Sequence, residues 1–416
     1  MINKNQKKIL ASNFIALSVL QSANYLLPLL TIPYLARVLE PDYFGLVAFS
    51  TAMTMYFMII TDYGFNLSAT RQISLCRDDE EKLSDIFSSV MIIKGCLMLF
   101  CLSLLLLIVF SFDMFSQHWE LYVASFGMVV GQVLFPIWLF QGMERMRYIA
   151  YLNLFSKMFF TLCIFIFVKE KSDYLLVPLL TSLGYMFAGI WSLYFVSKEF
   201  NVVFSLQDRH MLKFQLLEGW HVFVSGLAVS LYTVSSIFVL GVFTNSVTVG
   251  NFAAAEKIIF ALKGLFSPVS QAVYPFLSKA VHDDRSMGIG LIQGMAKFFG
   301  LGMFFISSSV FFLAEPIVLV VLGDQYRESI LILKVLAFVP TLVVLSNIYG
   351  VQAMLNLGYQ RDFSKIILKY GVLSILFFLI IVVPFKAVGV SAVILATELL
   401  ITVSIYLFVK KHVLSK

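Results

Sequence analysis

The stretch Ile9–Ala36 reads ILASNFIALSVLQSANYLLPLLTIPYLA and contains no Asp, Glu, Lys or Arg. It is longer than the roughly 20 apolar residues with which a helix crosses the hydrocarbon core of a bilayer. Leu121–Met143 and Val335–Gln360 are also free of charge and reach the same length. Lipid offers the main chain no hydrogen-bond partners, so such stretches predict membrane-spanning helices, whose main-chain groups pair internally.

The composition of the whole chain extends this prediction. Of the 416 residues, 60% are hydrophobic and 13% are charged, whereas soluble domains are about 45–50% apolar and about 25% charged. The four cysteines form no C-x-x-C pair, the five histidines are scattered, and no Gly-Lys dipeptide occurs. These patterns argue against a zinc module, a metal site and a P-loop. We therefore expect a membrane protein without a cofactor and without nucleotide hydrolysis by a P-loop.

Twelve segments are long and apolar enough to span a membrane, some of them with a single charge. The predicted fold class is an all-α polytopic membrane protein with about 12 transmembrane helices in two six-helix lobes. The predicted segments are 10–35, 43–63, 84–111, 119–141, 148–168, 174–196, 214–242, 250–276, 290–313, 328–355, 362–384 and 387–409.

The distribution of basic residues predicts the orientation. With the N-terminus in the cytoplasm, twenty of the 30 Lys and Arg residues fall at inner helix ends or in inner loops, and five fall in outer loops. This bias follows the positive-inside rule and places both termini in the cytoplasm. The formal net charge of +6 is then a topological signal, and nucleic acid is not expected as a partner.

The polar stretch near the middle of the chain predicts the division into lobes. We expect an N-terminal lobe over 1–196, a cytoplasmic linker over 197–213 and a C-terminal lobe over 214–416. A weak internal repeat supports two related halves, since Pro41–Ala48 and Ser246–Ala253 each place a glycine at the start of an apolar helix. A substrate site is expected where such halves meet.

Charged residues inside spans are the candidate site residues, because each costs about 2.5–3.5 kcal/mol on insertion scales and usually lines a cavity. Glu256 and Lys263 are seven residues apart and therefore share a helix face, which Ser267 and Ser270 continue. A water-filled cavity and a structural ion pair between helices both fit this pattern. Arg37 and Asp62 lie near helix ends, which favours an interfacial position. The candidate substrate-binding residues are Lys263, Lys94, Lys157, Glu256 and Lys257, and the candidate ion-coupling residue is Glu398.

Several motifs resemble a known family. PYLARVLEPDYFG at 33–45 is followed by DYGFNLSATR at 62–71, and GNFAAAEK at 250–257 is followed by PVSQAVYP at 268–275. These motifs, with the number and order of the helices, resemble the polysaccharide-transporter family, specifically the Wzx-type O-antigen flippases of Gram-negative bacteria. Glu256 and Lys257 stand in a matched motif and are carried over as site residues.

The resemblance implies a two-lobed bundle of the multidrug/oligosaccharidyl-lipid/polysaccharide exporter superfamily in the bacterial inner membrane. It implies that an undecaprenyl-pyrophosphate-linked oligosaccharide, destined for lipopolysaccharide, is moved from the cytoplasmic to the periplasmic leaflet. Membrane lipids, a polysaccharide polymerase and a chain-length regulator are the implied partners. Coupling to a proton or sodium gradient, or to the substrate gradient itself, is left open.

Two other functions are weighed against this one. A multidrug or cation exporter of the related branch would need an acidic cavity, whereas the charges within the predicted spans are net positive. A membrane-embedded polysaccharide polymerase would need positioned acids and a larger outer region, and the predicted outer loops are short. A transporter that is not an enzyme is the expected function.

Overall fold

The first helix, α1 (Lys4–Asp62), contains the first two predicted spans and is interrupted at Glu40, where φ is 58° and ψ is 170°. Glu40 precedes Pro41, and steric contact with the proline ring disfavours the helical region for the residue before it. The last long helix, α15 (Gln360–Val409), contains the last two predicted spans and is interrupted at Lys386, two residues after Pro384. At both places a single non-helical residue separates two spans.

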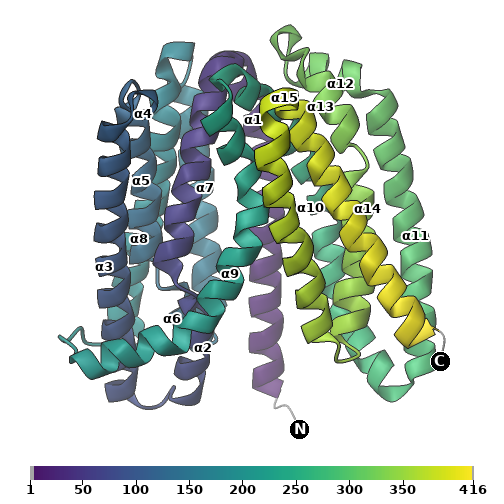
Figure 1. The fold of residues 1–416 in the computed structure, drawn as a ribbon. Coiled ribbons are helices and arrows are strands. Elements are labelled where there is room, and N and C mark those ends of the chain that lie inside the picture. The colour runs from purple at the N-terminus through teal and green to yellow at the C-terminus, as the bar shows by residue number, and fades with distance from the viewer. Residues whose placement is uncertain (1–3, 415–416) are drawn as a thin grey trace. The chain divides into compact units, whose positions relative to one another are not determined.

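A computed structural model describes the main chain of residues 4–414 (Figure 1). It describes their side chains except those at 4–19, 22, 25, 26, 225, 228–233, 272, 275 and 414. The described part is helical with no strands. Eight described helices or helix runs are long and apolar enough to cross a membrane. The predicted all-α class is confirmed, and each of the twelve predicted segments lies largely within helix.

The chain divides into two compact units. Unit 1 combines residues up to Leu27 with Phe49–Ser230, and unit 2 combines Pro28–Ala48 with residues from Leu231 onward. These limits differ from the predicted lobe boundaries in two ways, because part of α1 groups with unit 2 and most of α9 groups with unit 1. Hydropathy marks where a helix crosses a membrane and not which neighbours it packs against. It therefore could not show which unit these parts of α1 and α9 belong to.

The helices after α1 have the following bounds. Those up to α9 are α2 (Phe65–Leu75), α3 (Glu80–Ser111), α4 (Asp113–Ser116), α5 (Trp119–Leu134), α6 (Ile137–Gly142), α7 (Met146–Phe167), η1 (Lys171–Leu175), α8 (Leu176–Glu199) and α9 (Arg209–Phe243). Those that follow are α10 (Ser246–Asp283), α11 (Arg285–Phe312), α12 (Ala314–Val321), η2 (Asp324–Tyr326), α13 (Ser329–Leu336), α14 (Val339–Asn347), η3 (Ile348–Leu355), α15 and η4 (Lys410–Leu414).

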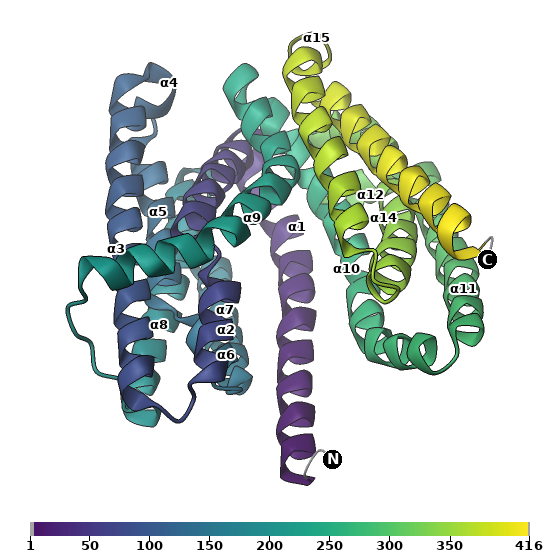
Figure 2. The same ribbon diagram turned by 60° about the horizontal axis from the view of Figure 1, so that its bottom comes forward.

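Small residues bring the helices of unit 1 close together. The Ser182 hydroxyl on α8 donates a hydrogen bond to the Ala124 main-chain oxygen on α5 at 2.6 Å, and the Ser125 hydroxyl on α5 donates one to Ser50 Oγ on α1 at 3.1 Å. Lipid tails are as apolar as leucine, so close packing and such hydrogen bonds hold spanning helices together. The beginning of α9 runs across the end of these helices (Figures 1 and 2).

The turn into α3 lies outside the spans and is stabilised by its own cap. Asp79 accepts a hydrogen bond from the Lys82 main-chain nitrogen at 3.1 Å, as N-cap residues do. The Lys82 ammonium is 2.8 Å from the same carboxylate. Hydrogen bonding to the Lys82 side chain, with that to its main chain, lowers the pKa of Asp79.

The two glycines of the internal repeat meet in unit 2. A Cβ atom on Gly45 would overlap the main-chain oxygen of Ser246, and one on Gly250 would overlap the main-chain oxygen of Pro41. Gly45 thus faces Ser246, four residues before Gly250, and Gly250 faces Pro41, four residues before Gly45. The two helices, α1 and α10, therefore make equivalent contacts with each other where they cross. The Ser246 hydroxyl also donates a hydrogen bond to Asp42 Oδ1. The repeat therefore corresponds to one symmetric helix crossing.

We expect Gly250→Ala to destabilise unit 2 by about 1–3 kcal/mol, the usual cost of overpacking. The atom that the new methyl group meets is a main-chain oxygen, which cannot rotate away. Thermal unfolding of the purified protein in detergent measures the effect. Gly294→Ala on α11 is the matched control, because a Cβ there meets nothing within 4 Å. Equal melting temperatures for the two variants would contradict the close crossing.

Candidate functional site

Unit 2 brings three predicted site residues together. Glu256 and Lys263 lie on α10, and Glu398 lies on α15. Lys263 interacts electrostatically with both Glu256 and Glu398, and all three side chains are partly buried. Two acids that are far apart in sequence, Glu256 and Glu398, thus both act electrostatically on Lys263.

Two neighbours complete this group. Lys257 also interacts electrostatically with Glu256, and the Ser236 hydroxyl on α9 donates a hydrogen bond to Glu256 Oε1 at 3.4 Å. We call Glu256, Lys257, Lys263 and Glu398 the unit 2 charged group. Its two lysines and two glutamates balance formally, which lowers the cost of holding these charges away from water. An anion that enters must therefore compete with a glutamate for Lys263.

Ser270, at the end of the predicted polar stripe, contributes to helix packing. Its hydroxyl donates a hydrogen bond to Asn347 Oδ1 at 2.7 Å, and the Gln352 amide donates to the Ser270 hydroxyl at 2.9 Å. Ser270 and Gln352 are both buried. At this position the polar side chains form hydrogen bonds between helices, which hold spanning helices together.

Lys94 and Lys157 belong to unit 1 and not to unit 2. Lys94 on α3 is only 1% exposed, and its electrostatic partner is Asp62. Lys157 on α7 is partly buried, and its ammonium donates a hydrogen bond to Asn24 Oδ1 on α1 at 2.7 Å. The roles of the five candidate residues in substrate binding and of Glu398 in coupling stay predictions.

Asp62 is a candidate site residue that the sequence did not single out. Its position near a helix end favoured an interfacial charge, but its Oδ1 atom is buried without a hydrogen-bond partner. It is the last residue of α1, and Gly64 before α2 has a φ of 76°. The interruption of an apolar helix by Asp-Tyr-Gly was the signal that could have drawn attention to it.

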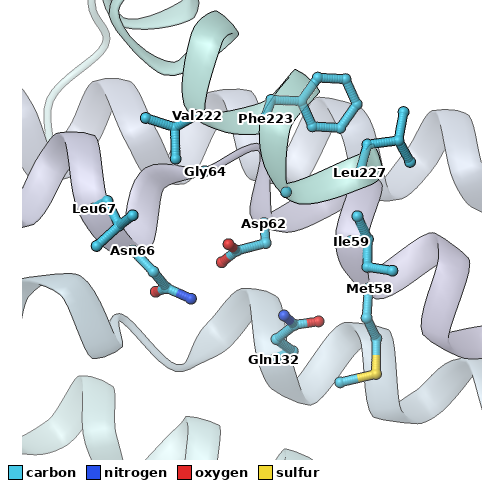
Figure 3. A pocket seen from close by; sticks show the side chains of 11 residues that line it. Met58, Ile59, Asp62, Gly64, Asn66, Leu67, Gln132, Val222, Phe223 and Leu227 are labelled. Atoms are coloured by element: carbon cyan, nitrogen blue, oxygen red, sulfur yellow. The ribbon is translucent and has the colours of Figure 1, made fainter. Parts of the chain in front are cut away.

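A pocket of about 370 Å³ surrounds Asp62 (Figure 3). The side chains of Asp62, Asn66 and Gln132 approach it from α1, α2 and α5, and Phe223 and Leu227 of α9 form another part of its wall. Gln132 Oε1 is also buried without a partner. This pocket, which we call the Asp62 pocket, lies entirely within unit 1.

Among the side chains that the structure describes, no group of three or more His, Cys, Asp or Glu residues could hold a metal ion. The polar side chains described above carry ammonium, carboxylate, amide and hydroxyl groups. Such groups can bind anions and hydroxyl-bearing ligands and can exchange protons.

Comparison with known proteins identifies the family. The family model described as polysaccharide biosynthesis protein matches residues 10–281. The chain belongs to this family. It is 35% identical over 406 residues to an Escherichia coli (strain K12) protein that is provisionally named an O-antigen transporter, and the alignment covers 98% of each chain. A Shigella dysenteriae protein with the same provisional name is 30% identical over 94% of this chain and 97% of its own length.

Solved structures show the fold that this family member adopts. The lipid II flippase MurJ in an inward closed conformation matches with a TM-score of 0.74 at 14% identity, over 95% of this chain and 87% of its own. An inward-facing multidrug resistance MATE family transporter of the MOP superfamily matches with a TM-score of 0.70, also at 14% identity, over 96% and 98% of the two chains. The predicted exporter-superfamily fold is therefore confirmed, and the protein is a multi-pass membrane protein.

Proposed function

We propose that this protein is a flippase for undecaprenyl-pyrophosphate-linked O-antigen oligosaccharide units. It moves them from the cytoplasmic to the periplasmic leaflet of the bacterial inner membrane by alternating access. The observation that carries this proposal is the 35% identity to the E. coli relative along 98% of both chains. An accessory role would be harder to reconcile with similarity that extends over every helix.

The lysines of unit 2 are suited to an anionic substrate. The pyrophosphate of such a lipid needs positive groups at membrane depth, and Lys263 and Lys257 supply them on α10. Because Glu398 interacts with Lys263, the pyrophosphate must compete with this carboxylate. A proton on Glu398 would remove one of the two carboxylates that compete for Lys263, so the arrangement offers a simple way to couple substrate binding to a proton gradient.

A multidrug or cation exporter is the alternative, since the fold is shared with a MATE transporter. The charged group of unit 2 contains as many lysines as glutamates and is thus less suited to cations than an acidic cavity. For the proposed flippase, a polysaccharide polymerase and a chain-length regulator are the expected partners, because they would use the translocated unit.

Deletion of the gene provides the first test. We expect long surface polysaccharide to disappear while lipid-linked oligosaccharide accumulates on the cytoplasmic face, because its assembly continues and its passage stops. The sidedness can be measured with a membrane-impermeant lectin on right-side-out and inverted membrane vesicles. Re-expression of the wild-type chain is the control. Unchanged surface polysaccharide in a strain without a second flippase, together with a gain in drug sensitivity, would favour the exporter instead.

A further inference from the structure

The Asp62 pocket contains two buried polar atoms that the protein leaves without hydrogen-bond partners. They are Asp62 Oδ1 and Gln132 Oε1, and they come from different helices that line one pocket (Figure 3). A buried acceptor without a partner costs about 1–3 kcal/mol. Most buried polar groups in folded proteins are paired, so two exceptions in one pocket point to a bound partner.

The electrostatics of the pocket restrict what that partner can be. Asp62 repels an anion such as pyrophosphate, and the buried Lys94, which interacts with Asp62, disfavours a cation. Both partnerless atoms are acceptors, so the ligand must supply hydrogen-bond donors. A neutral ligand rich in hydroxyl groups meets all three conditions.

The size and the walls of the pocket fit the same class of ligand. Its volume of about 370 Å³ falls within the range of about 300–1,000 Å³ typical of small-molecule sites and is far larger than the roughly 30 Å³ of one water molecule. Asn66 adds an amide that can both donate and accept, and Phe223 adds an aromatic wall. Phe223 is itself stacked on Tyr63, with ring centroids 4.8 Å apart.

We propose that the Asp62 pocket is a sugar-binding subsite, in which Asp62 and Gln132 accept hydrogen bonds from hydroxyl groups of the oligosaccharide. This inference rests on the proposed function and assigns the sugar moiety of its substrate to unit 1. Asn66 orients the sugar, and Lys94 offsets the charge of Asp62.

Gln132→Leu tests the subsite, since it preserves size and removes the acceptor. The probes are undecaprenyl pyrophosphate with its oligosaccharide, extracted from the native strain, and undecaprenyl pyrophosphate without sugar. We expect the purified variant to bind the bare carrier like the wild type and the sugar-bearing carrier about tenfold more weakly. Its melting temperature should be unchanged or higher, because a partnerless buried acceptor is removed.

Gln215→Leu is the matched control in the same unit. Gln215 is fully buried and exchanges hydrogen bonds of 2.8 and 2.9 Å with Gln72. This variant should melt at a lower temperature, since Gln72 loses its partner, and should keep the preference for the sugar-bearing carrier. The proposal is overturned if Gln132→Leu keeps the full preference, whatever its melting temperature.

A third probe separates this inference from the proposed function. Soluble oligosaccharide, released from the carrier by mild acid, should raise the melting temperature of the wild type and not that of Gln132→Leu. If the wild type binds neither carrier but responds to the free sugar in this way, the subsite stands and the proposed function fails. If the free sugar has the same effect on both chains, or none on either, the subsite fails.

Discussion

Replacement of Lys94 with Met is expected to lower the free energy of unfolding by about 1–3 kcal/mol, because it removes the positive charge that interacts with the buried carboxylate of Asp62. Lys94 is 1% exposed, and the interaction with Asp62 partly offsets the cost of burying its charge. Asp62→Asn should have a comparable effect, since it leaves the Lys94 ammonium unpaired. Chemical or thermal unfolding of the purified protein in a fixed detergent measures both changes.

The double variant Lys94→Met with Asp62→Asn decides whether the two residues act as a pair. It removes both charges and should recover a large part of the lost stability, since buried ion pairs are often replaceable by neutral groups. Lys82→Met, on the same helix, is the control: its ion pair with Asp79 is exposed and should be dispensable. If the double variant lost as much as the two single variants combined, the two residues would not be a pair.

Lys263→Met is expected to reduce transport by about tenfold to a hundredfold, the loss that corresponds to one charge-assisted hydrogen bond. Lys263→Arg should retain part of the activity because the charge survives, although a planar guanidinium does not reproduce the geometry of an ammonium. Transport can be followed by the restoration of surface polysaccharide in the deletion strain at matched protein levels. Lys334→Met provides a second lysine for comparison, outside the unit 2 charged group.

A purely structural role for Lys263, in which it only neutralises the glutamates, can be tested as well. Loss of Lys263 removes a positive charge that interacts with Glu256 and Glu398. Lys263→Met with Glu398→Gln restores the charge balance. If Lys263 binds substrate, the double variant should be folded and inactive. If Lys263 only neutralises Glu398, the double variant should be folded and active, and Lys263 would leave the proposed site.

Glu398→Gln alone addresses coupling. The amide imitates a protonated carboxyl group, so a coupling residue should leave a folded protein whose transport no longer depends on the pH gradient. The measurement compares flipping in vesicles with and without an imposed gradient. If the folded variant depends on the pH gradient as the wild type does, Glu398 is not the coupling residue. If Glu398→Gln prevents folding and the additional change Lys263→Met restores it, Glu398 and Lys263 form a structural pair.

The candidate site could be predicted only in part. Lys94, Lys263 and Glu398 were selected because charges in apolar helices are costly, and this local criterion needs no knowledge of neighbours. Their partners could not be predicted in the same way: Asp62 is 32 positions from Lys94, and Glu398 is 135 positions from Lys263. Gln132 carries no charge, so nothing along the chain distinguished it from the other polar residues in spans.

By itself, the sequence determined the helical spans, with the gaps at 36–42 and 385–386 between neighbouring spans, and the family. In lipid, the main-chain groups of each span must form hydrogen bonds within that span. The sequence pattern that predicts a span is therefore contained in a short run of residues. Only the tertiary structure decided that part of α1 packs in unit 2, that Gly45 and Gly250 share one crossing, and that Asp62 lies in a pocket with Gln132. These features depend on which helices pack side by side. Because spanning helices and lipid tails are equally apolar, small residues and polar pairs decide which helices pack together.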